Sequence, residues 1–240
     1  MSTSQPTTAQ LRVMVIMAHP DDAEFTCGGT VASYTAAGAR AEYVLATSGN
    51  RGSHEPGMTP EKLAAIREAE QRAAAEVLGV AEVTFLRYND GEVEPSIALR
   101  RELALVLRKG RPDIVLTFDP WQHYQVHPDH RAIGQSTLDA IADARMPMYY
   151  PEQISGDVRD HRVLDVYFFA TDHPNHWVDI TETIDKKIAA LRCHVSQVGD
   201  RDMDPFMRAR GRAVGQERGM LYAEAFRHLP MIHPTIPGPR

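Results

Sequence analysis

The stretch RVMVIM at residues 12–17, followed at once by AHPDDAE at residues 18–24, decides the fold class of this chain. Five of the first six residues are apolar, which is typical of a short strand buried on both faces of a parallel sheet. The polar run after them places one imidazole and three carboxylates in the loop that leaves the strand. Gly28 and Gly29 then begin a segment, residues 28–37, that is predicted to be helical and is ended by Gly38.

The rest of the chain repeats this alternation of apolar runs and helical segments. Further strands are predicted at residues 41–46, 83–86, 113–118 and 163–170, and helices at residues 60–78, 97–109, 127–144, 182–194 and, for the most part, 204–227. Strands that alternate with helices pair in parallel through right-handed crossovers, which predicts a Rossmann-like α/β fold with a mostly parallel central sheet flanked by helices. We expect one domain over residues 11–240, behind a disordered lead of residues 1–10. Residues 145–160 are expected to be irregular, and residues 230–240 extended.

Composition and charge exclude several classes of protein. The 240 residues carry 26 Lys and Arg against 32 Asp and Glu, and the net charge of −6 argues against a nucleic-acid binder. Short basic runs at residues 108–111 and 208–212 are interpreted as solvated helix ends. No apolar stretch has membrane-spanning length, and residues 1–10 lack the pattern of a signal peptide. Cys27 and Cys193 form no C-x-x-C pair, so we expect a cytoplasmic protein with no membrane partner; assembly into a homo-oligomer stays open.

The loop after the first strand is the first candidate for chemistry. His19, Asp21 and Asp22 lie around a proline, and turn formation with helix capping by an aspartate explains them as well as function does. Adjacent carboxylates repel one another, however, and a bound cation relieves that repulsion. In a tight turn His19 and one aspartate can face a metal while the other aspartate stays free as a base. Spacing alone leaves open which aspartate does which.

A second polar cluster, His127, Asp129 and His130, follows the predicted strand at residues 113–118. The two histidines are three apart, so at a helix start they lie on nearly the same face. One can bind a metal while the other reaches a substrate, and Asp129 is expected to orient His127. In parallel sheets, ligands bind beyond the carboxyl ends of the strands, where both clusters fall. A three-ligand metal site with an open position and spare acid–base groups predicts metal-assisted hydrolysis.

These residues resemble a known family, the PIG-L/LmbE-like N-acetylglucosaminyl deacetylases. The segment AHPDDAE is similar to the family's A-H-P-D-D-x-E signature, and RPDIV at residues 111–115 with HPDH at residues 127–130 is similar to its second signature. Further matches are Arg67-x-x-Glu70 and Lys187-x-x-Ala190-Leu191-x-x-His194-x-Ser196-Gln197. The resemblance runs from about Val13 to Phe226 and so covers nearly the whole chain.

The resemblance implies one zinc ion per chain, held by His19, Asp22 and His130. It implies Asp21 as general base and His127 as the imidazole that stabilises the oxyanion or protonates the leaving amine. It also associates Arg67 with substrate binding, and it places His194, a further candidate for substrate binding, in a segment that can reach the active site.

The expected activity is zinc-dependent removal of an N-acetyl group from an N-acetylglucosamine-type sugar or sugar conjugate, with a small amino-sugar substrate as the only partner. Asn50 and Arg51 lie in a loop rich in hydrogen-bond donors and are candidates for substrate binding, although a solvated loop explains them equally well. Trp121 and Tyr124 are candidates for stacking on a sugar ring or for packing. Two alternatives remain: an amidase that acts on a thiol-sugar conjugate, and an oxidative non-haem iron enzyme, since two histidines and a carboxylate also suit iron.

Overall fold

The computed structural model describes residues 10–231, and its seven strands form one sheet in the order β3-β2-β1-β4-β5-β7-β6. Residues 1–9 of the predicted lead and residues 232–240 of the predicted extended end lie outside the described residues. Strands β1 to β5 pair in parallel, while β7 is antiparallel to both β5 and β6. The predicted α/β class with a mostly parallel sheet is confirmed. The strands are β1 (Arg12–Met17), β2 (Arg40–Thr47), β3 (Glu82–Tyr88), β4 (Ile114–Phe118), β5 (Asp165–Phe169), β6 (His176–Asp179) and β7 (Ala223–Pro230).

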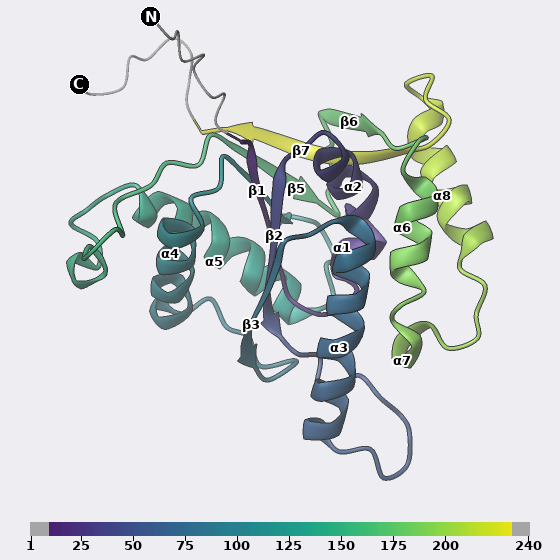
Figure 1. Cartoon of the computed structure of the whole chain (residues 1–240), viewed down its shortest axis with the longest axis horizontal. Helices are drawn as coiled ribbons and strands as arrows, with labels where there is room; N and C mark the ends of the chain where they lie inside the picture. The colour runs from purple at the N-terminus through teal and green to yellow at the C-terminus, as the bar shows by residue number, and fades with distance from the viewer. Residues whose placement is uncertain (1–9, 232–240) are drawn as a thin grey trace, which may run out of the picture.

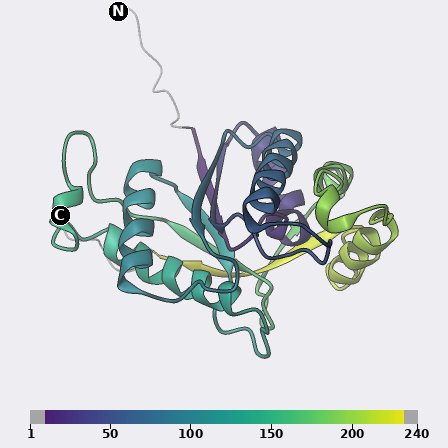
Figure 2. The same ribbon diagram turned by 90° about the horizontal axis from the view of Figure 1, so that it is seen from below.

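Helices cover both faces of the sheet. Figures 1 and 2 show α4 and α5 on one side, and α1, α2, α3 and α6 on the other, with α8 outside α6. The bounds are α1 (Asp22–Thr26), α2 (Gly28–Ala36), α3 (Pro60–Leu78), α4 (Ile97–Gly110), α5 (Pro128–Ala144), α6 (Ile184–Leu191), α7 (Val195–Val198) and α8 (Asp204–Gln216), with a short 3₁₀ turn at Pro151–Gln153. No helix in residues 10–231 combines the length and the apolar character that crossing a bilayer requires.

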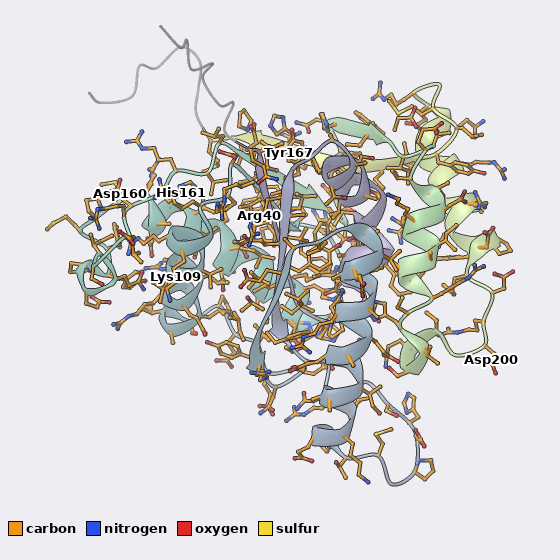
Figure 3. The ribbon with its side chains drawn as sticks, in the orientation of Figure 1. Arg40, Lys109, Asp160, His161, Tyr167 and Asp200 are labelled. Atoms are coloured by element: carbon orange, nitrogen blue, oxygen red, sulfur yellow. The ribbon has the colours of Figure 1, made fainter. Side chains whose placement is uncertain are left out.

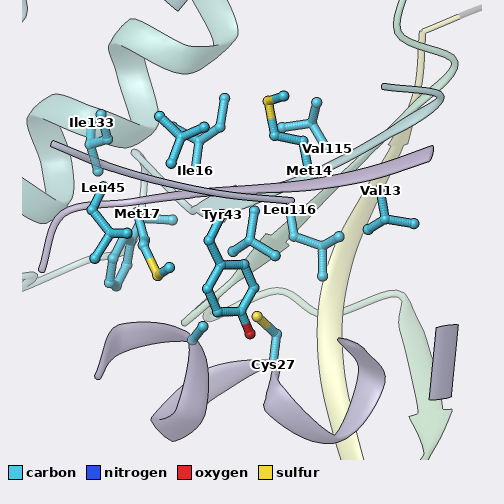
Figure 4. Close-up of a cluster of buried hydrophobic side chains, with 14 of the residues drawn as sticks. Val13, Met14, Ile16, Met17, Cys27, Tyr43, Leu45, Val115, Leu116 and Ile133 are labelled. Carbon is cyan, nitrogen blue, oxygen red and sulfur yellow. The ribbon is translucent and has the colours of Figure 1, made fainter. Parts of the chain in front are cut away.

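The core lies on both faces of β1, as its apolar sequence predicts. Its five apolar residues, Val13 to Met17, are all buried. Figure 4 shows Ile133 of α5 on one side of the sheet and Cys27, beside the ring of Tyr43, on the other. A strand that is covered on both faces is fixed firmly in place, so the loop that leaves it starts from a rigid element.

The last part of the chain differs from its prediction. Residues 204–227 are not mostly helical, because α8 ends at Gln216 and the chain turns at Gly219, whose φ of 69° is left-handed. The strand β7 follows and pairs with β5 over a separation of about sixty residues, which no local pattern reveals. The four-residue strand β6 was missed for the same reason, since its only partner is β7. The helix predicted at residues 182–194 is shorter, and a second helix, α7, follows it.

The basic run at residues 108–111 was interpreted as a solvated helix end, and for Arg108 this interpretation is wrong. Arg108 is 1% exposed, and its guanidinium donates to the carbonyl oxygens of Asp143, Ala144, Met146, Tyr149 and Tyr150 and to the side-chain oxygen of Gln153. These acceptors are the last carbonyls of α5 and the irregular segment after it, so one buried cation orders that segment. His161, at the end of the same segment in Figure 3, faces the carbonyl oxygen of Pro112 at 2.7 Å.

Candidate active site

The two polar clusters meet because β1 and β4 are neighbours in the sheet and run in parallel. The loop after β1 carries His19, and the loop after β4 leads to His127, which is the N-cap of α5. Helix α5 passes close to the end of β4 because residue 134 is glycine; a Cβ there would collide with the backbone of Phe118. The ring of His130, one turn earlier, stacks on the ring of Phe118 with centroids 3.9 Å apart.

His19, Asp22 and His130 bring their donor atoms together. His19 Nδ1 lies 3.2 Å from His130 Nε2, which lies 3.2 Å from Asp22 Oδ1, and His19 Nδ1 lies 3.7 Å from Asp22 Oδ2. Ligand atoms around a tetrahedral zinc ion, with bonds of roughly 2.0–2.2 Å, lie about 3.4 Å apart. The distance between the two imidazoles, and the distance from each imidazole to its nearer oxygen of Asp22, are compatible with one such ion.

Two further combinations of donors also suit a metal ion. The donor atoms of His19, His127 and His130 lie within 4.8 Å of one another, and so do those of His19, Asp90, His127 and Asp129. The described residues thus contain a His/Asp group able to hold a metal. Which of its members bind the ion stays a prediction.

Asp129 orients His19, and the expectation that its carboxylate orients His127 is wrong. Its Oδ2 lies 2.9 Å from His19 Nε2 and accepts from the backbone N–H of Gly91 at 2.7 Å, while Oδ1 accepts from that of Val93 at 3.1 Å. Burial opposes the charge, but the bonds from His19 and Gly91 hold the pKa of Asp129 below its usual range. A carboxylate can only accept, so His19 Nε2 carries a proton, and Nδ1 faces Asp22 and His130. Burial lowers the pKa of His19, but the carboxylates of Asp129, Asp22 and Asp90 outweigh it and raise that pKa well above 6.5, so binding a metal through Nδ1 would displace a proton.

His127 meets Asp129 through the backbone instead. Its Nδ1 accepts from the backbone N–H of Asp129 at 3.3 Å, so in the neutral ring the proton is on Nε2. That Nε2 lies 3.8 Å from Asp90 Oδ1, and 39% of the side chain is exposed. Partial burial, and then the neighbouring His19 and His130, lower the pKa of His127 below its ordinary value of 6.5. His127 is thus a neutral N–H donor that a substrate can reach.

Asp21 is held beside the metal-capable group in a rare backbone conformation, with φ 92° and ψ −20°. Its Oδ2 accepts from Arg67 Nη2 at 3.2 Å, and the same guanidinium nitrogen donates to the carbonyl oxygen of Pro20 at 2.7 Å. Burial is the main cause that raises the pKa of Asp21 from 3.8 to about 7, although Arg67 opposes it. The pKa of Asp22 moves the other way: burial raises it, but His130 and His19 together hold it well below its usual range. Two adjacent aspartates therefore differ in their affinity for a proton, as a ligand and a base must.

The four residues expected to bind substrate are engaged within the protein. Arg67 is 4% exposed, and Gly49, with φ 62°, wraps its guanidinium so closely that a Cβ would collide with it. Asn50 bonds Asn89 and the backbone N–H of Asp90, and Arg51 donates to the carbonyl oxygen of Asp90 and to Glu92. Because Arg51 stays 47% exposed, substrate contact by this loop remains a prediction.

His194 is fully buried and faces Glu24, with 3.3 Å between its Nε2 and Glu24 Oε2. The side chain is therefore closed off from solvent in this structure, and contact of His194 with a substrate stays a prediction. Trp121 and Tyr124 are 65% and 97% exposed, so both side chains lie at the surface and neither packs in the core.

Asp90 is the residue of this site that the sequence motifs missed. Asp90 is buried, and its Oδ1 lies 3.2 Å from His19 Nε2. Burial raises the pKa of Asp90, but the contact with His19 outweighs burial and holds this pKa below its usual range. The signal was present, because Asn89-Asp90-Gly91 follows β3 at the same edge of the sheet as the two motifs.

Comparison with known proteins identifies the family. The family model described as PIG-L, GlcNAc-PI de-N-acetylase, matches residues 14–141. The chain is 34% identical to diacetylchitobiose deacetylase of Thermococcus kodakarensis over 95% of its own length and 87% of that protein. This chain belongs to the PIG-L family.

Two further PIG-L proteins show the same relation. A probable N-acetyl-alpha-D-glucosaminyl L-malate deacetylase of Bacillus anthracis is 31% identical over 77% of this chain and 80% of that protein. The solved structure of N,N'-diacetylchitobiose deacetylase from Pyrococcus horikoshii superposes with a TM-score of 0.88 at 32% identity, and covers 96% of this chain and 89% of the other. Membership of this family makes the chain an N-deacetylase, a hydrolase of amide bonds.

Proposed function

We propose that this protein uses one zinc ion per chain to remove the N-acetyl group from an N-acetylglucosamine-type sugar or sugar conjugate. Relatives that it matches over most of their length are deacetylases of diacetylchitobiose and of N-acetylglucosaminyl malate. The observation that carries the proposal is the convergence of His19, Asp22 and His130 beside the separately held carboxylate of Asp21. His130 Nε2 lies 3.2 Å from both His19 Nδ1 and Asp22 Oδ1, and His19 Nδ1 lies 3.7 Å from the other oxygen of Asp22.

His19, Asp22 and His130 are the residues that we assign to the zinc ion. Two neutral imidazoles and one carboxylate leave a divalent ion with net positive charge and an open position, as catalytic zinc requires. A zinc ion bound there supplies Lewis acidity, lowering the pKa of a bound water to about 7 and polarising the amide carbonyl. Asp129 supports this by fixing the ring of His19 from the other side.

Asp21 serves as the general base that takes the proton of the attacking water. Its carboxylate is 16% exposed and held by Arg67, so it is reachable but cannot turn away. A base with a raised pKa becomes an adequate acid once it has accepted a proton, and Asp21 then delivers that proton to the leaving amine.

His127 stabilises the oxyanion as a neutral donor. Its Nδ1 is occupied by a backbone N–H, so Nε2–H is the donor that it offers to the developing charge. A donor of this kind contributes roughly 3–4 kcal/mol to the transition state. The lowered pKa of His127 favours this role over delivery of a proton to the amine.

The experiment is acetate release from a panel of free N-acetylglucosamine, diacetylchitobiose and malate- and inositol-linked N-acetylglucosamine, with and without a chelator. Asp21→Asn should reduce kcat by roughly 10²–10⁴-fold, while elemental analysis still finds one zinc per chain. Loss of zinc from Asp21→Asn would mean that ligand and base are exchanged. Absence of acetate release on every substrate would refute the deacetylase proposal for this panel.

The family comparison does not support the alternative of an oxidative non-haem iron enzyme, because the matched proteins are deacetylases. Oxygen consumption together with analysis of the bound metal tests it directly. An amidase that cleaves a thiol-sugar conjugate shares the site and differs only in substrate, so such a conjugate belongs in the panel. A single domain over residues 11–240 and a cytoplasmic location stay predictions.

A further inference from the structure

Gln71 of helix α3 is a fully buried amide that touches the Asp21 turn and has no place in the reaction described above. Its Oε1 accepts from the backbone N–H of Asp21 at 3.0 Å. Arg67, one helical turn earlier on α3, donates to the carbonyl oxygen of Pro20 at 2.7 Å. The carbonyl of Pro20 and the N–H of Asp21 belong to the same peptide group. Two side chains spaced i, i+4 on one helix therefore hold both ends of that peptide.

This peptide has to be held. Asp21 has a φ of 92°, in the left-handed region that residues other than glycine adopt only at a cost in free energy. Glycine would adopt this conformation freely but has no carboxylate to serve as base. An aspartate kept in this conformation therefore needs surroundings that enforce it.

The orientation of the Gln71 amide is fixed by a second hydrogen bond, from its NH₂ group to Glu24. Its Nε2 donates to Glu24 Oε1 at 3.1 Å, and Glu24 is fully buried. A carboxylate can only accept, so the amide must present its NH₂ group to Glu24 and its oxygen to Asp21. The second oxygen of Glu24 lies 3.3 Å from Nε2 of the fully buried His194, but the two atoms do not form a hydrogen bond. The hydrogen-bonded chain of buried groups thus runs from Glu24 of α1, through Gln71 of α3, to the backbone of Asp21.

We propose that Gln71, oriented by Glu24, is a positioning residue that sets the direction of the Asp21 carboxylate. The inference rests on the proposed function, in which Asp21 is the base. Arg67 holds the other end of the same peptide and also donates to the Asp21 carboxylate. A substitution of Arg67 would therefore remove both contacts at once and could not separate their effects.

The test is Gln71→Met, which keeps the side-chain length but cannot accept the N–H of Asp21. Misplacement of a catalytic group by about 1 Å costs up to roughly 100-fold, so we expect kcat to fall about 10- to 100-fold. KM should change by less than about threefold, and zinc content should stay at one per chain, because the metal ligands and the substrate contacts are left intact.

Gln153→Met is the matched control. Gln153 is also buried and also makes one bond through each end of its amide, to Arg108 and to the carbonyl oxygen of Arg101, but it belongs to the 3₁₀ turn in the segment after α5. Both variants should lower the unfolding temperature, whereas only Gln71→Met should lower kcat. An unchanged kcat in Gln71→Met, an equal fall in both variants, or loss of zinc would overturn the proposal.

A double-mutant cycle with Asp21→Asn separates this inference from the proposed function. If Gln71 acts through Asp21, Gln71→Met should cost less than about twofold in the Asp21→Asn background, because the effects of groups that act as a unit are not additive. An undiminished cost there would overturn the inference and leave Asp21 as base. Full activity in Asp21→Asn alone would instead overturn the assignment of the base.

If Gln71→Met fails to fold, Glu24→Met replaces it. This change keeps the length of the side chain but removes the carboxylate that accepts from Gln71 Nε2. A fall in kcat with unchanged KM and zinc content supports the proposal, and an unchanged kcat overturns it.

Discussion

Replacing Asp129 by asparagine should weaken metal binding while the fold is kept. The carboxylate of Asp129 accepts three bonds, from His19 Nε2 and from the backbone N–H groups of Gly91 and Val93. Asparagine has one oxygen and one NH₂ group. Whichever way its amide turns, at least one of the three donors then faces another donor, inside a site where the Asp129 side chain is 0% exposed.

Two independent estimates give the same magnitude. A hydrogen bond to a charged group contributes about 1.5–3 kcal/mol, and at least one such bond is lost. Loss of the partner that orients a metal-binding histidine typically lowers metal affinity about 10- to 100-fold, which corresponds to roughly 1.4–2.7 kcal/mol. We therefore expect the zinc dissociation constant of Asp129→Asn to rise by one to two orders of magnitude, about 10- to 100-fold.

The assay is competition for zinc against a chromophoric chelator at fixed pH. Asp119→Asn is the control, because Asp119 is also buried and accepts from the backbone N–H of Trp121 at 2.9 Å, but none of its hydrogen bonds involves a histidine. Its zinc affinity should stay within about twofold of the unchanged protein, since no partner of a ligand is lost. If Asp129→Asn also stays within twofold, or if both variants lose affinity equally, the role given to Asp129 is refuted.

Three more predictions concern the ligands, the base and the segment after α5. His130→Ala should empty the site, whereas His127→Ala should keep one zinc per chain and lower kcat by about 10²–10³-fold; zinc analysis and steady-state kinetics test both. The pKa of Asp21 is raised to about 7 from 3.8, so in the zinc-free chain its contribution to stability is present below about pH 4 and lost as the pH rises to about 7. Thermal unfolding in chelator should therefore find Asp21→Asn more stable than the unchanged protein at about pH 8, with the difference vanishing near pH 4. An equal difference in stability at the two pH values would contradict the raised pKa of Asp21 as its cause. Arg108→Met leaves at least three buried oxygens without a donor, at roughly 1–3 kcal/mol each, so denaturant unfolding should report a loss of about 3–9 kcal/mol with kcat/KM unchanged.

The parts of the fold that local patterns determine were predictable. The helix at Pro60–Leu78 has both its bounds written in the sequence, with Thr59 accepting from Lys62 as N-cap, proline at N1 and Gly79 left-handed at its end. Strand β1 was predicted because burial on both faces requires a continuous apolar run. Strands β6 and β7 were not, because β7 is stabilised by pairing with β5 and β6, which are distant in sequence or short, and its last four residues are largely exposed, as in a surface segment.

The candidate site divides in the same way. Two short motifs at strand ends predicted that their histidines and aspartates share one site, and the neighbouring strands β1 and β4 bring the motifs together. The choice of His19, Asp22 and His130 as metal ligands came from the family resemblance and stays a prediction. The partners that orient them come from elsewhere in the chain. Asp90 follows β3, and nothing in the sequence around it states that the loop after β3 packs on α5 through bonds from Gly91 and Val93 to Asp129. The pairing of Asp129 with His19 instead of His127 likewise depends on how α5 lies against β1 and β4.

The sequence rules fail where the chemistry is concentrated, and the reason is physical. Asp21 has a backbone conformation that suits glycine, and Asp129 is a carboxylate buried completely at the start of a helix. Each choice is unfavourable by itself and is stabilised only by bonds from distant residues: Arg67 and Gln71 to the Asp21 turn, and Gly91, Val93 and His19 to Asp129. A position at which local preference is overruled by several long-range bonds marks a group whose direction matters more than its contribution to folding. By that criterion Asp21 and Asp129 are singled out by the backbone and by burial, independently of any motif, as the two carboxylates on which the site depends.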